Sequence, residues 1–300
     1  MRYAVRWGVP LAPLLLVGCS LFHRPGPASV SQPRYVVGPA YRAGGVWFYP
    51  REDFYFDATG LAVVLPDRSG PTADGEVRDS TTMAGAHATL QLPTIARVTN
   101  LETGLQVLVR INDRGPASPG RLIGLTRHAA DKLGIAPGGV AQVRVQVENG
   151  PSQALRNSLQ GGTGIAVMSA PRVPVASETL APPPGQAQSA RGRMVTAILP
   201  ATAASIAAPI VPARLSDTVV RVPVSPTQLW LRAGEFGQAS YANQVRARLG
   251  GLSTTVERVR QGRFETFRVR AGPFAYVGQA DSALDQAMRA GVTDARIVVE

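Results

Sequence analysis

Residues Val109–Arg121 read V-R-I-N-D-R-G-P-A-S-P-G-R, and they decide how the first half of the chain is interpreted. The preceding run G-L-Q-V-L-V-R-I (104–111) has the apolar, β-branched composition of a strand. Gly115 and Pro116 prevent a helix directly after it. We therefore expect Asp113 to lie at a strand end, beside a rigid turn that fixes the direction of its carboxylate.

Two uses of Asp113 are compatible with this position. It can cap its own turn or pair with Arg114, which is the commoner use of Asp in such turns, or it can carry chemistry. His87, in A-G-A-H-A-T-L (84–90), has the same ambiguity. A lone histidine among small residues is more often a satisfied surface or core side chain than a catalyst.

Strand-like runs continue on both sides of this stretch. I-A-R-V-T-N-L (95–101) and V-A-Q-V-R-V-Q-V (140–147) are bounded by turn signals such as E-T-G and P-G-G. One short helix is expected, with Thr126 as its N-cap and Gly134 as its stop. Several short strands with one brief helix predict a small closed barrel.

The last 74 residues alternate differently. Strands are expected near 228–233, 254–260, 265–271 and 295–299, and two helical stripes of apolar residues lie between them. The stripes are Ala242, Val245 and Leu249, then Ala280, Leu284, Ala287 and Met288. The order βαββαβ predicts an antiparallel sheet with both helices on one face and the other face open.

Side chains alternate across a strand, so the open face is expected to carry an indole among guanidinium groups. A flat ring flanked by charged donors suits a sugar ring or a nucleic-acid base. The alternative is a solvated sheet face on which an arginine stem covers the indole. The candidate binding residues are Gln228, Trp230, Arg232, Arg268 and Arg270.

Composition and the N-terminal pattern divide the rest of the chain. Arg2 and Arg6 precede an apolar run too short to span a bilayer, which is typical of an export signal. The Pro- and Ala-rich stretch between the two compact regions cannot bury enough apolar surface to fold. We predict a signal peptide (1–18), a tether (19–33), a barrel domain (34–148), a disordered linker (149–226) and a C-terminal domain (227–300).

The charge and the cysteine count restrict the function further. The formal net charge is +11, which suits nucleic acid in a cytoplasmic protein. An export signal argues against nucleic acid and leaves two explanations of the positive charge, anionic polymers of the cell envelope or simple solubility. The only cysteine, Cys19, excludes an intrachain disulfide. His23, His87 and His128 lack the spacing of metal ligands, so no metal site is expected.

The C-terminal region resembles the sporulation-related repeat (SPOR) domain. The resemblance lies in L-W-L-R-A-G-E-F (229–236), F-R-V-R-A-G-P-F (267–274) and A-G-V-T-D-A-R-I-V (290–298). It implies binding of peptidoglycan glycan strands that lack stem peptides. Arg232 departs from the pattern, in which Gln is common at this place.

The barrel region resembles the rare lipoprotein A family of septal lytic transglycosylases. T-A-D-G-E (72–76), A-H-A-T-L-Q-L-P (86–93), R-V-T-N-L (97–101) and N-D-R-G-P (112–116) occur in the family's order, where the first motif reads T-A-N-G-E. The resemblance implies a double-psi β-barrel, followed by a linker and a SPOR domain of mixed α+β, ferredoxin-like architecture.

The implied reaction cleaves the β-1,4 bond between N-acetylmuramic acid and N-acetylglucosamine without water or a cofactor, and closes a 1,6-anhydro ring. Asp113 would serve as acid and then base, for which its pKa must be raised. Glu76 and Asp79 would tune it, and His87 would orient the acid or a sugar hydroxyl. We expect Asp113 and His87 to converge on one groove.

Two departures from the family pattern favour an alternative. The chain has A-V-V-L-P (62–66) where the family has A-S-W-Y-G, and Gly124 stands where the family has a carboxylate. Both changes remove side chains that would bind a sugar, the aromatic pair in the first case and the carboxylate in the second. A peptidoglycan-binding lipoprotein without catalysis is therefore the competing reading.

Leu16-Val17-Gly18-Cys19 resembles the lipobox of bacterial lipoproteins. The resemblance implies that Cys19 is acylated and becomes the mature N-terminus. Ser20 is not the Asp that marks retention in the inner membrane, so the implied location is the periplasmic side of the outer membrane, enriched at the division septum.

Overall fold

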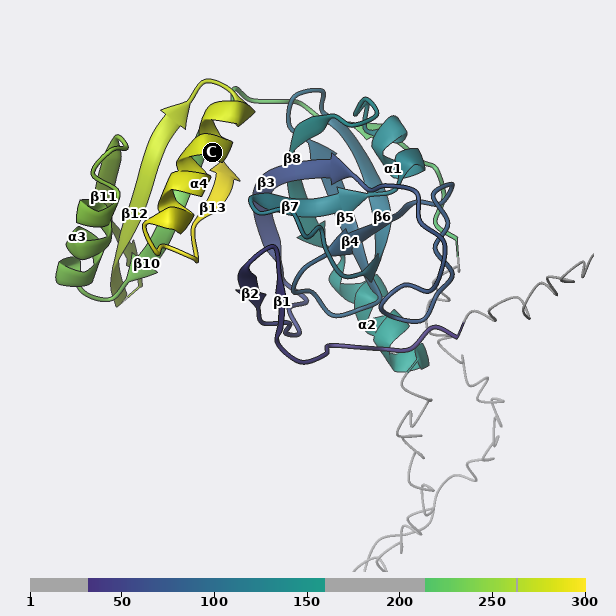
Figure 1. The fold of residues 1–300 in the computed structure, drawn as a ribbon. Coiled ribbons are helices and arrows are strands. Elements are labelled where there is room, and N and C mark those ends of the chain that lie inside the picture. The colour runs from purple at the N-terminus through teal and green to yellow at the C-terminus, as the bar shows by residue number, and fades with distance from the viewer. Residues whose placement is uncertain (1–31, 160–213, 263) are drawn as a thin grey trace, which may run out of the picture.

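A computed structural model describes residues 32–159, 214–262 and 264–300. These residues form a barrel and a smaller α+β domain beside it (Figure 1). The predicted signal peptide, the acylated Cys19 and most of both tethers lie outside the described residues. No described helix has the length and apolar content that a bilayer crossing requires.

Six strands close the barrel, and the small closed barrel that the strand pattern predicts is confirmed. Its order is β4-β7-β3-β8-β5-β6, and β4 also pairs with β6 to complete the ring. Two pairings, β3–β7 and β4–β6, are parallel, and the others are antiparallel. The strands are β3 (Asp57–Val64), β4 (Ala84–His87), β5 (Thr94–Asn100), β6 (Leu105–Asp113), β7 (Arg121–Leu125) and β8 (Val140–Val147).

Alternation of side chains fills the barrel interior. Val107, Val109 and Ile111 alternate along β6 and are at most 2% exposed, as expected for a strand with one face in a core. Helix α1 (Arg127–Lys132) follows β7, and the Thr126 hydroxyl accepts a hydrogen bond from the amide of Ala129. The predicted N-cap is confirmed.

Two short elements precede the barrel and one helix follows it. The hairpin of β1 (Tyr41–Ala43) and β2 (Val46–Phe48) precedes the first barrel strand in the chain. Helix α2 (Asn149–Leu159) follows the last barrel strand and packs on β5. The Ser152 hydroxyl donates to the carbonyl of Ile95 and accepts from its amide, both at 3.1 Å. The predicted disordered linker is therefore wrong over its first eleven residues, because α2 satisfies the backbone of Ile95 near the start of β5, a tertiary contact that composition cannot reveal.

The end of the predicted linker is also ordered. Strand β9 (Val220–Arg221) pairs with β6, and Arg214 and Asp217 form ion pairs with barrel side chains. Leu215 packs against the barrel core. Residues 160–213, where most of the predicted disorder falls, lie outside the described residues.

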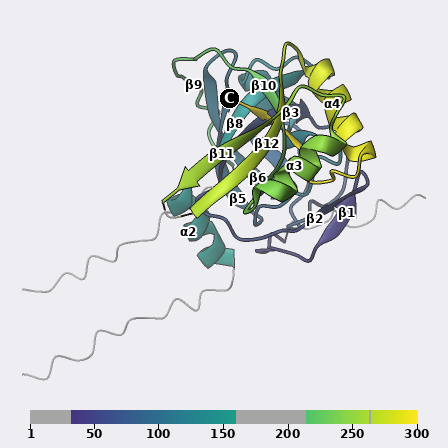
Figure 2. The same ribbon diagram turned by 90° about the vertical axis from the view of Figure 1, so that its left-hand side faces the viewer.

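The C-terminal domain has the predicted βαββαβ order and a four-stranded antiparallel sheet, β11-β12-β10-β13. Helices α3 and α4 cover one face (Figure 2). Its elements are β10 (Leu229–Phe236), α3 (Ala239–Arg248), β11 (Thr254–Gln261), β12 (Phe264–Phe274), α4 (Val277–Arg289) and β13 (Arg296–Val299).

The edge strand β13 and helix α4 face the barrel (Figure 1). The Thr59 hydroxyl of β3 donates to the carbonyl of Val299 at 2.6 Å and accepts from its amide at 3.2 Å. Leu61, also on β3, is fully buried in the core cluster of the C-terminal domain. The barrel thus covers a sheet edge that would otherwise expose unpaired backbone groups.

Candidate active site

A groove of about 520 Å³ opens on the barrel between the end of β3, the loop before β4 and the turn after β6. Asp113 lies in it, at the last position of β6 as the sequence predicts. The charged side chains that line the groove are Arg68, Arg78, Asp79, Asp113 and Arg114. The site is therefore an open, charged furrow.

Both carboxylate oxygens of Asp113 are occupied. Oδ1 accepts hydrogen bonds from the amides of Ala73 and Arg114, each at 2.9 Å. Oδ2 forms an ion pair with Nη2 of Arg78 at 2.6 Å. The side chain is 16% exposed, so it is held in one direction while still reachable from the groove. Asp113 therefore accepts a hydrogen bond within its own turn and also lines the groove, so both of its predicted uses are compatible with the structure.

Arg114 fixes the turn that carries Asp113. Its guanidinium donates to the carbonyls of Leu90 and Val37, both at 2.5 Å. Burial lowers its pKa from the ordinary value, although the guanidinium stays charged at any neutral pH. The N-D-R-G turn is thus tied to the chain that precedes β1 and to the loop after β4.

Asp79 also lines the groove. It accepts hydrogen bonds from the amide and the hydroxyl of Thr81, at 2.8 and 2.6 Å, and pairs with Arg214 at 2.7 Å. The bonds from Thr81 lower the pKa of Asp79. Asp79 is therefore an ionised neighbour in the same groove as Asp113.

Glu76 lies outside the groove lining. Its carboxylate accepts from Nε of Arg110 at 2.7 Å and from Nδ2 of Asn112 at 2.8 Å. Both partners are on β6, so Glu76 braces the 72–76 loop against the strand that ends in Asp113. Because this loop supplies the Ala73 amide to Asp113, Glu76 acts on the acid through the backbone.

His87 does not line the groove that holds Asp113. The ring is 3% exposed, contacts the edge of Phe56, and is absent from the groove lining. Nδ1 accepts from the amides of Thr89 and Leu90, both at 3.2 Å, so a neutral ring carries its proton on Nε2. Burial lowers its pKa to about 3. The expected convergence with Asp113 on one groove is not found, because strand alternation turns the ring inward.

Two residues that the sequence did not single out belong to this site. Arg78 binds Asp113 directly, and only its proximity to the T-A-D-G-E motif pointed to it. Asp74 is fully buried behind the groove, where its Oδ1 accepts from the Thr72 hydroxyl at 2.6 Å. Its Oδ2 has no hydrogen-bond partner, and burial raises its pKa to about 6. The available signal was an Asp where the family motif has Asn.

The open face of the C-terminal sheet carries the predicted aromatic and basic residues. Trp230 and Arg232 point away from the helices, since Leu229 and Leu231 are buried against them. The guanidinium carbon of Arg270 lies 4.0 Å from the centre of the Trp230 ring, a cation–π contact. One face of the indole is therefore covered in this structure.

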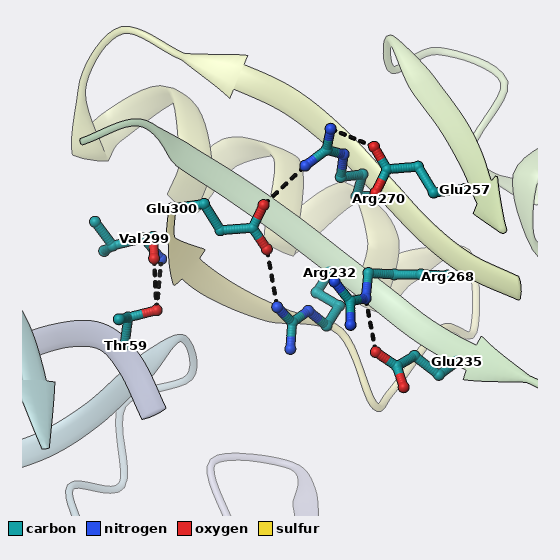
Figure 3. Close-up of polar contacts among 8 residues, drawn as sticks. All are labelled: Thr59, Arg232, Glu235, Glu257, Arg268, Arg270, Val299 and Glu300. Atoms are coloured by element: carbon teal, nitrogen blue, oxygen red, sulfur yellow. Dashed lines mark hydrogen bonds and ion pairs between the residues drawn. The ribbon is translucent and has the colours of Figure 1, made fainter. Parts of the chain in front are cut away.

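Glutamates neutralise the arginines of this face (Figure 3). Glu300 lies between Arg232, at 2.9 Å, and Arg270, at 2.7 Å. Arg270 also pairs with Glu257, and Arg268 pairs with Glu235 at 2.6 Å. Gln228 is exposed and directly precedes β10. The three arginines of the predicted set are therefore held in ion pairs, and Trp230 contacts one of them.

Residues 32–159, 214–262 and 264–300 contain no group of three or more His, Cys, Asp or Glu side chains that could hold a metal ion. The charged groups that line the groove are carboxylates and guanidinium groups.

Comparisons with known proteins match both domains. The family profile described as "Lytic transglycolase" covers residues 52–145, and the profile described as "SPOR domain" covers residues 225–297. The chain is 34% identical over 214 residues to the endolytic peptidoglycan transglycosylase RlpA of Pseudomonas aeruginosa. The match covers 70% of this chain and 60% of that relative, so the chain spans about three fifths of its length.

Proteins of the same name from other bacteria match as well. The one from Vibrio cholerae is 45% identical over 76 residues, 25% of this chain and 29% of the relative. The one from Escherichia coli is 34% identical over 152 residues, 42% and 41% of the two chains. A crystal structure of the RlpA SPOR domain from P. aeruginosa is 23% identical, with a TM-score of 0.23, and covers 23% of this chain and 96% of that one.

A closed barrel with a charged groove, followed by a SPOR domain, defines a double-psi barrel protein with a terminal SPOR module. The chain has the two domains of the rare lipoprotein A (RlpA) family in the order that its resemblance to this family implies. The predicted family and fold class are confirmed.

Proposed function

We propose that this chain is a lytic transglycosylase that cleaves the β-1,4 bonds between N-acetylmuramic acid and N-acetylglucosamine in peptidoglycan. The observation that carries the proposal is Asp113, a carboxylate aimed into an open groove by two backbone amides. The relatives named endolytic peptidoglycan transglycosylases support the reaction class.

One carboxyl group can perform both proton transfers of this reaction. The protonated form gives its proton to the leaving glycosidic oxygen as the bond to C1 breaks. The carboxylate then removes the proton of the muramic 6-hydroxyl, whose oxygen bonds to C1 and closes the anhydro ring. No water is consumed and no cofactor is required.

Three neighbouring residues would support the proton transfers of Asp113. Asp79 would stabilise the positive charge that develops on the sugar ring, since it lines the same groove and its ionised form is favoured. Glu76 would hold the loop that supplies the Ala73 amide. His87 would hold the backbone of residues 87–90 to which Arg114 is anchored. In this proposal Glu76 and His87 are positioning residues.

The C-terminal sheet face would bind glycan strands that lack stem peptides. An indole flanked by donors supports this, because sugars stack on aromatic faces and present hydroxyls around their rims. Arg270 covers Trp230 in this structure, so a stacked sugar would have to displace it. The residues assigned to binding are Gln228, Trp230, Arg232, Arg268 and Arg270.

The location proposed for the chain is the periplasmic side of the outer membrane, with enrichment at the division septum. An acylated Cys19 would anchor it, since two or more acyl chains give stable membrane attachment. Mass spectrometry of the protein extracted from membranes tests this, with Cys19→Ala as the control that should lose both the acyl mass and the membrane fraction.

The activity is tested on purified glycan strands without stem peptides. Products with 1,6-anhydro ends, measured by mass spectrometry, are expected from the purified chain and not from Asp113→Asn. Asp67→Asn is a matched control, because Asp67 is exposed and lies outside the groove lining. The absence of anhydro ends from the unmutated chain would refute catalysis.

A second candidate is a peptidoglycan-binding lipoprotein without catalysis. It is favoured by the full occupation of both Asp113 oxygens. Tyr41 is also the one aromatic side chain among the described residues that line the groove. Retention on glycan-only sacculi without release of anhydro products would support it, and a loss of retention in Trp230→Ala would place the binding on the sheet face.

A further inference from the structure

Arg78 is the groove residue in direct contact with the proposed acid. It lies between the T-A-D-G-E motif and β4, and its Nη2 is 2.6 Å from Oδ2 of Asp113. Its side chain is 32% exposed and lines the same groove. Its Nε is buried and has no hydrogen-bond partner. The guanidinium is therefore anchored to the carboxylate at one end and reachable from the groove.

This ion pair opposes the first step of the proposed reaction, because a guanidinium beside a carboxylate favours its ionised form. Oδ1 already accepts from two backbone amides, so Oδ2 is the oxygen that must carry the proton to the substrate. A guanidinium has five donor hydrogens and no acceptor, so a protonated Oδ2 cannot donate to Arg78 and loses the charge-assisted pair with it. Departure of Arg78 from Oδ2 therefore favours the protonated form in which Asp113 acts as an acid.

Peptide-free glycan strands carry a group that can compete with Asp113 for Arg78. In a peptide-free strand each muramic acid residue bears a free lactyl carboxylate, whereas attachment of a stem peptide converts it into a neutral amide. Guanidinium groups bind carboxylates through two parallel hydrogen bonds, so the sugar carboxylate can compete with Asp113. Arg68, an exposed residue of the same groove, adds a second positive charge for the incoming anion.

We propose that Arg78 is the specificity-determining residue of this groove, passing from Asp113 to the lactyl carboxylate of a peptide-free muramic acid residue and so freeing Oδ2 to carry a proton. The inference rests on the proposed function. One ion pair is exchanged for another, and the carboxylate left on Asp113 takes up a proton from solvent. That proton goes to the glycosidic oxygen, and Asp113 regains one from the muramic 6-hydroxyl.

The first test compares two forms of one substrate. Peptide-free glycan strands are used as isolated, and after coupling of their lactyl carboxylates to methylamine. The unmutated chain is expected to cleave the carboxylate form with a kcat/KM at least about tenfold higher, because a charge-assisted pair is lost in the amide. Arg78→Gln is expected to cleave both forms with similar kcat/KM, and Arg78→Lys to keep part of the preference.

The control is Arg127→Gln, which removes an exposed arginine that pairs with Asp67 and is not among the residues that line the groove. It should keep the full preference, and thermal unfolding of all variants checks that each is folded. A wild-type preference retained in Arg78→Gln, or no preference in the unmutated chain, would overturn the proposal.

A second test needs no turnover and separates this proposal from the proposed function. In the full chain, the NMR signal of the Arg78 side-chain N–H, assigned by its loss in Arg78→Lys, is followed during titration with N-acetylglucosaminyl-N-acetylmuramic acid. A shift with the acid and none with its methylamide is expected. If no anhydro product is found, the proposed function fails, and this titration alone decides whether Arg78 reads the carboxylate. An unmoved signal would overturn the inference.

Discussion

Leu65 fills the space that a side chain at position 124 would need. A Cβ built on Gly124 would lie 2.4 Å from Cδ2 of Leu65, far inside van der Waals contact. Leu65 belongs to the A-V-V-L-P segment, and Gly124 replaces the carboxylate of the family pattern. The two departures from that pattern therefore lie in direct contact, with Leu65 lining the groove.

A carboxylate restored at position 124 should destabilise the barrel. Gly124→Asp is expected to cost about 1–3 kcal/mol of unfolding free energy, because it overpacks against Leu65. Leu65→Ala should recover much of that loss, which a double-mutant cycle from urea unfolding measures. Additive effects of the two changes would show that Leu65 does not determine the glycine.

Asp74 should make the barrel less stable as pH rises. Its folded pKa is about 6 against an ordinary value of 3.8, so its protonated form is favoured by folding. The stability it contributes is fully present below pH 3.8 and is lost as pH rises through about 6. The shift corresponds to about 3 kcal/mol at pH 7.

The measurement is urea unfolding between pH 4 and 7 of the chain and of Asp74→Asn, which mimics the protonated carboxyl. The variant should lack this loss of stability and be the more stable protein at pH 7. Asp285→Asn, an exposed position on α4, serves as the matched control and should leave the pH dependence unchanged. An Asp74→Asn chain with the original pH profile would contradict the assignment.

His87 should stay neutral across the physiological range. Burial lowers its folded pKa to about 3, so the stability it contributes is present above its unfolded value near 6.5 and is lost as pH falls toward 3. The ring ¹⁵N shifts are expected to report one Nε2–H tautomer from pH 7.5 to 4.5. In guanidinium the same ring should titrate near its ordinary value, and titration in the folded chain near pH 6 would place the ring in water.

The ion pair between Arg121 and Asp281 should hold the two domains together. Nη1 and Nη2 of Arg121 donate to the two oxygens of Asp281, at 2.6 and 2.9 Å, and Arg121 is 13% exposed. Hydrogen exchange of the Val299 amide, which donates to Thr59 of the barrel, reports the contact directly. Arg121→Asp should speed that exchange severalfold, consistent with about 1 kcal/mol for a part-exposed pair.

The matched control is the exchanged pair, Arg121→Asp with Asp281→Arg, which should restore the protection of Val299. Protection that is unchanged in both single variants would show that apolar contacts such as Leu61 suffice to dock the domains.

Local patterns in the sequence determined both folds. Alternation in 104–111 and 140–147 defined barrel strands, and the stripe ending in Leu249 defined a helix of the C-terminal domain, because these patterns record which face each element buries. The position of Asp113 followed in the same way, since a strand that meets Gly115 and Pro116 has to stop there.

Only the tertiary structure decided what surrounds that carboxylate. The sequence does not say that Arg78 reaches Asp113, that His87 turns into the barrel wall, or that Leu65 covers Gly124. Each of these depends on how the closure of the barrel juxtaposes loops that are distant along the chain. Burial then determines which charged form each side chain keeps, and so Asp74 and His87 acquired roles that their motifs alone could not assign.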